Sequence, residues 1–94
     1  MIKWFADLFK KHHPEYRKIY AVTTGQFLGE MLIFIKQVDN MMHFLSVPQN
    51  TNRVIPYDKF EFGKQHKILD LVEIAPKLVV ETAVKQYLKN ESNN

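Results

Sequence analysis

The stretch that decides the fold is residues 31–47, MLIFIKQVDNMMHFLSV. Its two apolar runs are separated by Asp39-Asn40, and both of these residues tolerate the positive φ that a tight turn needs. The pattern predicts an antiparallel hairpin with strands over Glu30–Val38 and Met41–Val47. The centre of the first strand, residues 31–35, is apolar at every position, so we expect both of its faces to be covered. The predicted register opposes Val38 to Met41, Ile35 to Phe44 and Phe34 to Leu45.

Three further strands are predicted around this hairpin. Ile19–Thr24 precedes it and ends at a glycine, and Ile68–Ile74 forms the last apolar run. Between them, two phenylalanines alternate with charged residues, which favours a half-buried strand over Tyr57–Phe62. The proline before that segment is also a common first residue of a short helix, which is the alternative there. Gln49–Asn52 is interpreted as a polar loop.

A helix is predicted at each end of the chain. Residues 1–13 place their apolar side chains on one face and lysines on the other, and residues 77–89 show a similar division. A polar tail, 90–94, is expected to fray. With five short strands over residues 19–74, the order predicts a single α+β domain, 1–94. Its expected form is a small five-stranded antiparallel SH3-like barrel or meander between an N-terminal and a C-terminal helix.

The composition is that of one small globular domain. The chain has 94 residues, of which 46% are hydrophobic and 24% charged, and this excludes a disordered or low-complexity chain. It contains no cysteine, which excludes disulfides, thiolate metal sites and cysteine nucleophiles. No apolar run has the length that spans a bilayer, and the first residues do not form a secretory signal. We therefore expect a cytoplasmic protein.

The positive charge is concentrated at the N-terminus. Residues 1–18 carry five Lys or Arg and two Asp or Glu, so they account for the whole net charge of +3. A basic amphipathic helix can dock on a partner or a membrane surface. The alternative, which we favour because an apolar stripe at helical spacing is normally core, is that this helix packs on its own domain.

Glycines and polar turns also suggest a family. Gly25 and Gly29 precede the apolar strand, Asp39-Asn40 and Met41-Met42 follow it, and Gly63 comes before the last strand. This arrangement resembles the two motifs of the Sm-like fold, and the helix followed by five strands is similar to SH3-like barrels in general. The aspartate lies farther from the glycines than in the Sm motif, and a phenylalanine stands where the second motif has arginine. The resemblance implies a ring oligomer that binds single-stranded RNA.

The sequence contains no recognisable catalytic or cofactor motif. The three glycines form neither a phosphate-binding loop nor a dinucleotide fingerprint. His12 and His13 are adjacent, so on a helix they point in different directions and cannot hold one ion together. Glu61 and Lys64 are three apart, which on a strand puts them on opposite faces and breaks a nuclease-like arrangement. We therefore expect no enzyme activity, no cofactor, no metal and no small-molecule substrate.

The function that remains is a non-catalytic interaction or adaptor protein, which binds another protein or a second copy of itself. Its candidate partner-binding residues are Trp4, Phe5, Lys10, Lys11, Gln49, Asn50, Asn52 and Arg53. One alternative is an Sm-like protein that binds RNA or DNA, for which the candidates are Asp39, Asn40, Lys59, Lys64, His66 and Lys67. The other alternative is peripheral attachment to a membrane through the N-terminal amphipathic helix.

Overall fold

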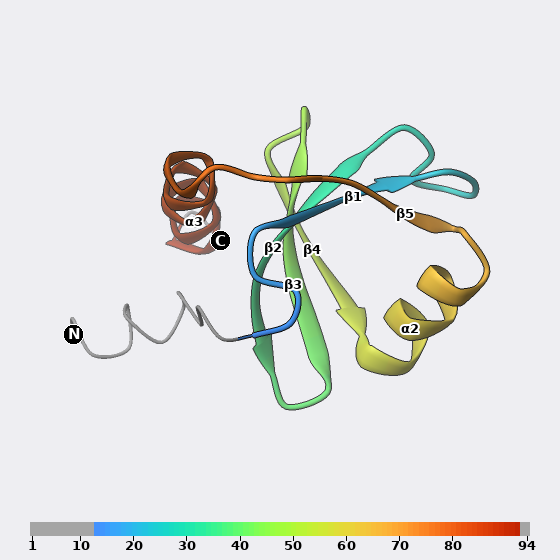
Figure 1. The fold of residues 1–94 in the computed structure, drawn as a ribbon. Helices are drawn as coiled ribbons and strands as arrows, with labels where there is room; N and C mark the ends of the chain where they lie inside the picture. The colour runs from blue at the N-terminus through green and yellow to red at the C-terminus, as the bar shows by residue number, and fades with distance from the viewer. Residues whose placement is uncertain (1–12, 93–94) are drawn as a thin grey trace.

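The structure, a computed structural model, describes residues 13–92. The predicted N-terminal helix, apart from His13, lies outside these residues. The elements are β1 (Lys18–Val22), β2 (Met31–Val38), β3 (Met41–Val47), β4 (Thr51–Pro56), α2 (Tyr57–Gln65), β5 (Leu69–Ile74) and α3 (Lys77–Ser92). The strands form one antiparallel sheet in the order β4-β3-β2-β1-β5 (Figure 1). The α+β class and the five-stranded antiparallel sheet are confirmed, and the sheet is open, with β4 and β5 at its edges.

The central hairpin is present as predicted, but half of its register differs. Asp39 has a φ of 53° in the tight turn, and Val38 opposes Met41. Beyond Lys36 the pairing shifts by one residue, so Phe44 opposes Phe34 and not Ile35 as expected. By the same shift Leu45 opposes Ile33, so the predicted pair with Phe34 is also wrong. The cause is a β-bulge, which inserts one extra residue into β2 and which an alternation pattern does not reveal.

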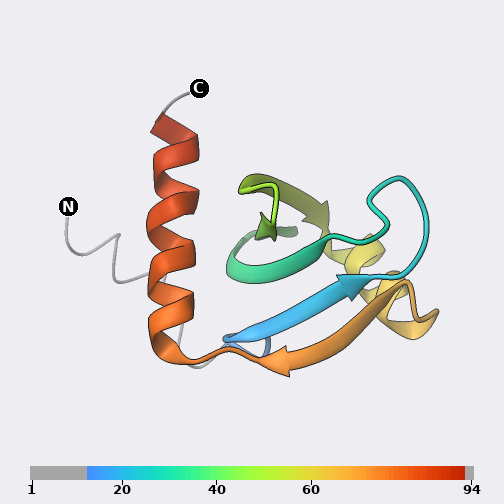
Figure 2. The ribbon, with the colours of Figure 1, turned by 90° about the horizontal axis from the view of Figure 1, so that it is seen from above.

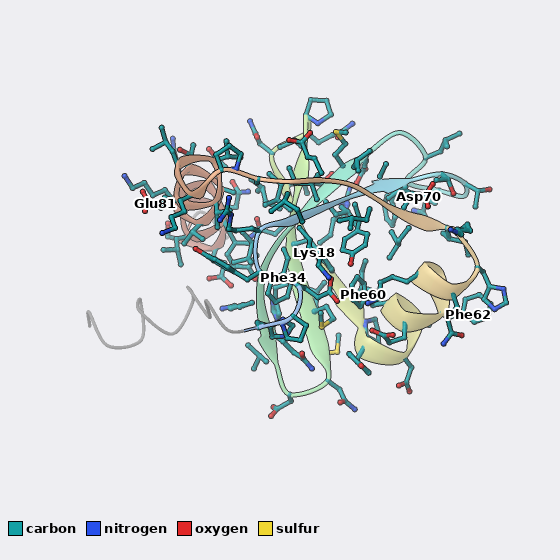
Figure 3. The ribbon with its side chains drawn as sticks, viewed as in Figure 1. Lys18, Phe34, Phe60, Phe62, Asp70 and Glu81 are labelled. Carbon is teal, nitrogen blue, oxygen red and sulfur yellow. The ribbon has the colours of Figure 1, made fainter. Side chains whose placement is uncertain are left out.

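The predicted strand over 57–62 is wrong, because this segment begins helix α2. Pro56 is the residue before the helix, and Asp58 in the first turn suits the positive end of the helix dipole. The fourth strand is instead Thr51–Pro56, which overlaps the segment interpreted as a polar loop. In the helix Phe60 points toward the sheet, whereas Phe62 lies on the outer side (Figure 3). Only one of the two phenylalanines is therefore core.

The sheet has a hydrophobic core on each of its two faces. Helix α3 covers one face (Figure 2). There Ile33 and Ile35 of β2 pack with Val84 and Tyr87. Helix α2 covers the other, concave face, whose core residues are Tyr20, Val22, Leu32, Phe34, Met42, Phe44, Phe60 and Leu69. Residues 32–35 are all at most 5% exposed, which confirms for them that the strand is covered on both faces, whereas Met31 is only partly buried. Within residues 13–92, neither helix is both long enough and apolar enough to cross a bilayer.

The C-terminal helix is confirmed and is longer than predicted. It continues through Asn90 to Ser92, where a frayed tail was expected. The reason is a tertiary contact: the Asn90 side-chain amide donates to the backbone carbonyl of Asn50 at 2.7 Å and to the Asn52 side chain at 3.0 Å. These hydrogen bonds fasten the last turn of α3 to the β3–β4 connection.

The two edge strands differ in regularity. The β3–β4 ladder runs without a shift from Met41–Pro56 to Ser46–Thr51. In β5, by contrast, Glu73 opposes Ile19 while Leu71 opposes Tyr20, so Val72 is an extra residue in a β-bulge. Asp70 and Glu73 also place charges on this strand. Bulges and charges are devices that protect a sheet edge from pairing, and β5 has both, whereas the ladder of β4 is regular.

Candidate binding groove

A groove of about 730 Å³ lies on the concave side of the sheet. It is lined by β4 and by residues of the β1–β2 loop, α2 and β5. Five consecutive residues of β4, Asn52–Pro56, form one wall. Phe27 of the β1–β2 loop and Phe62 of α2 contribute to the opposite wall, and Leu32 and Leu69 line it from the core. The volume is in the range of sites that take ligands, and the lining is mainly apolar.

The edge of β4 presents its backbone hydrogen-bonding groups on the side of this groove. In an antiparallel ladder, residues alternate between those that bond to the neighbouring strand and those whose backbone groups point away. Tyr57 donates its N–H to the carbonyl of Asn40 at 2.6 Å, which extends the β3–β4 ladder and fixes this alternation. Asn52, Val54 and Pro56 therefore direct their backbone groups away from β3. Pro56 has no N–H, and such an edge position tolerates proline.

A partly buried ion pair fixes one end of the groove. The Arg53 guanidinium donates to both carboxylate oxygens of Glu30, at 3.1 and 2.8 Å, and the Ser46 hydroxyl donates to the same carboxylate at 2.6 Å. These donors, first of all Arg53, hold the pKa of Glu30 below its ordinary value despite its burial. Arg53 also lies over the ring of Phe27, with 4.3 Å between the guanidinium carbon and the ring centroid. The pair therefore anchors the β1–β2 loop to β4.

A second buried glutamate, Glu15, lies near the start of β1. Glu30 lies beside Val22, at the opposite end of β1. Glu15 accepts hydrogen bonds from the Tyr20 hydroxyl and, at 2.9 Å, from the Lys64 ammonium group. Burial alone would raise the pKa of Glu15, but these hydrogen bonds and the charges of Lys64 and Lys18 keep it below its ordinary value. Lys64 is also 3.2 Å from Glu61. This cluster fastens the segment before β1 to helix α2.

These two carboxylates make stability depend on pH. Because the pKa of Glu15 and of Glu30 is lowered in the folded state, their contribution is present above the ordinary glutamate pKa of 4.5. It is lost as the pH falls from there through the folded-state values. We expect the free energy of unfolding, measured by urea denaturation, to decrease as the solution is acidified below about pH 4.5.

The control for this pH dependence is a pair of isosteric variants. Glu30→Gln is expected to lose less stability between neutral and acid pH than the unmodified chain. Glu81→Gln, on the exposed face of α3, is expected to keep the full dependence. An unchanged acid dependence in Glu30→Gln would contradict the assignment of this carboxylate.

The candidate partner-binding residues fall into three places. Asn52 and Arg53 line the groove. Gln49 and Asn50 lie in the β3–β4 turn, where Asn50 has a φ of 55° and its carbonyl is bonded to α3. The remaining four, Trp4, Phe5, Lys10 and Lys11, lie outside the described residues.

The candidate nucleic-acid residues are distributed over both ends of α2. Asp39 and Asn40 lie beside its first residue, Tyr57. Lys64, His66 and Lys67 lie at its other end, about 13 Å away for a helix of this length. Lys59 is the one of the six that lines the groove. The structure therefore does not bring these six residues together on one surface.

The sequence interpretation missed several residues of the groove. Phe27 lies between Gly25 and Gly29, whose φ values are +90° and +92°. That pattern of two glycines around an aromatic residue was a readable sign of an exposed loop tip. Glu30 gave no such sign, because its contact with the buried Ser46 beneath the groove joins residues that are 16 positions apart in the sequence.

Comparisons with known proteins give no further guide to the site. No protein-family model matches the chain, and neither the curated proteins nor the solved structures contain a match. In the part of the chain that the structure describes, no three His, Asp or Glu side chains gather closely enough to hold a metal ion. The groove and the β4 edge are thus the features from which a function can be argued.

Proposed function

We propose that this protein is a non-catalytic interaction module that binds an extended segment of a partner protein along β4. The observation that carries the proposal is the coincidence of a regular free strand edge with an apolar groove beside it. A strand added to such an edge gains main-chain hydrogen bonds, and its alternate side chains enter the groove. Asn52 and Val54 would donate their N–H groups, and the carbonyl of Pro56 would accept.

We also propose that the sheet is an SH3-like barrel that is left open at this groove. The strand order and the position of α2 between β4 and β5 support this description. The bound segment would extend the sheet at β4 and cover the opening of the barrel, without a ladder to β5. A cytoplasmic location is part of the same proposal, and the absence of cysteine in the chain is compatible with it.

Two substitutions at one position, Val54, distinguish strand addition from other modes of binding. Val54→Pro removes an N–H that points away from β3, and an edge strand tolerates this change. Val54→Ala removes the side chain but keeps the N–H. For peptides selected from a random 12-residue display library on the unmodified chain, we expect Val54→Pro to bind about tenfold more weakly than Val54→Ala, as measured by fluorescence polarisation.

Two results would contradict the proposal. One is that the unmodified chain enriches no peptide sequence in the selection. The other is that both Val54 variants, shown by urea denaturation to be folded, bind the selected peptides equally well. The second result would mean that the groove acts through side-chain contacts without a main-chain ladder.

A further inference from the structure

The charged side chains along the groove differ in whether they have an ion-pair partner. Within residues 13–92, the ionisable residues that line it are Glu30, Arg53 and Lys59. Glu30 and Arg53 neutralise each other through the ion pair described above, with 2.8 Å between Nη2 and Oε2. Lys59 is exposed and has no ion-pair partner among residues 13–92. Among the residues that the structure describes, the groove therefore carries one positive charge that no ion pair compensates.

From this charge we propose that the segment bound in the groove carries an acidic residue, aspartate or glutamate, at the end next to Lys59. This inference rests on the proposed function and names the chemistry of the partner. Lys59 is the third residue of α2, which begins directly after β4, so its ammonium group belongs to the Pro56 end of the groove. For a segment antiparallel to β4, that end holds its N-terminal part.

The rest of the lining determines the other side chains of the segment. Val22, Leu32, Ile55, Phe62 and Leu69 present apolar atoms to the groove. A segment with large apolar residues at alternate positions would bury them against these side chains. The expected ligand is thus apolar along most of its length and negatively charged at one end.

A polyanion fits the same groove less well. Nucleic-acid binding draws its affinity from many phosphate contacts, each of which needs a cation. Lys64, the other lysine of α2 near this site, is held by Glu15 and Glu61, at 2.9 and 3.2 Å. One available ammonium group matches one carboxylate, and a protein segment supplies that most simply.

The test is a peptide selection on three proteins: the unmodified chain, Lys59→Glu and Lys85→Glu. Lys85 is also an exposed helical lysine, but it lies on α3 at the other face of the sheet, so its reversal changes the net charge equally. The unmodified chain and Lys85→Glu should enrich apolar peptides with Asp or Glu at one end. Lys59→Glu should enrich apolar peptides with Lys or Arg there.

The selected peptides also give a measured magnitude. For an acidic peptide that the unmodified chain selects, replacement of its Asp or Glu by the amide should weaken binding about two- to fivefold at low salt, as for other exposed ion pairs. This difference should shrink at high salt, because exposed charges are screened. Lys59→Gln should remove the preference without reversing it.

The outcomes distinguish this inference from the proposed function. If no peptides are enriched on the unmodified chain, the proposed function itself fails. If apolar peptides are enriched without any preference for acidic residues, the groove binds protein segments but the assignment to Lys59 is overturned. A preference for acidic residues that persists in Lys59→Glu also overturns it, since another cation would then be responsible.

Discussion

Replacement of Phe60 by alanine is expected to lower the free energy of unfolding by about 3–5 kcal/mol. Phe60 is fully buried on the inner side of α2, with its ring centroid 5.5 Å from that of Tyr20 and 5.4 Å from that of Phe44. Truncation leaves a cavity in the concave core and removes the large buried side chain with which α2 packs on the sheet. A domain of this size has only about 5–14 kcal/mol in total, so the loss is a large share. Urea denaturation measures it through the midpoint.

Phe62→Ala is the matched control for this prediction. It makes the same chemical change two residues later in the same helix, but Phe62 is 54% exposed. We expect a change below about 0.5–1 kcal/mol, as for other exposed positions. Equal losses in the two variants would mean that Phe60 is not the residue that attaches α2 to the sheet.

The second large effect is expected for Arg53→Ala, which leaves the carboxylate of Glu30 buried without its cation. Removal of one partner from a fully buried pair costs about 3–5 kcal/mol. Here the side chain of Arg53 is 25% exposed and that of Glu30 is 9% exposed, so we expect about 2–3 kcal/mol. Part of this loss comes from the contact between Arg53 and the ring of Phe27. The measurement is again the free energy of unfolding at neutral pH.

A double variant separates the charge from the packing. In Arg53→Ala combined with Glu30→Gln, no charge is left buried, so the pair should be less destabilised than the sum of the two single variants. Strict additivity would show that Glu30 and Arg53 do not interact in solution, and it would contradict the ion pair at the end of the groove.

The parts of the fold that depend on local signals could be predicted from the sequence. The β2–β3 hairpin follows from Asp39-Asn40 between two apolar runs, and α3 follows from its own periodicity. Helix α2 could not be predicted in this way, because Phe60 and Phe62 alternate as they would in a strand. The burial of each ring depends on the sheet against which the helix packs: Phe60 is buried there, and Phe62 is exposed.

The groove was predictable only in part. Asn52 and Arg53 were identified as polar residues on a surface segment, and both do line it. Their strand was missed because Thr51–Pro56 has no alternation of apolar and polar residues. In this strand Arg53 faces the concave core, where it is matched by Glu30, a residue 23 positions earlier. An ion pair between residues far apart in the sequence therefore allows a charged side chain at a position where the local pattern would require an apolar one.

The bulge at Val72 has a consequence for stoichiometry. Copies of a protein that join edge to edge in the same direction can grow into open filaments, provided that both edges of each sheet can pair. In β5 the ladder is interrupted at the bulge, and Asp70 and Glu73 add charge beside it. The β5 edge of one copy is therefore poorly suited to pair with the β4 edge of the next copy. If β4 takes up a partner strand as proposed, we therefore expect one-to-one complexes and not polymers.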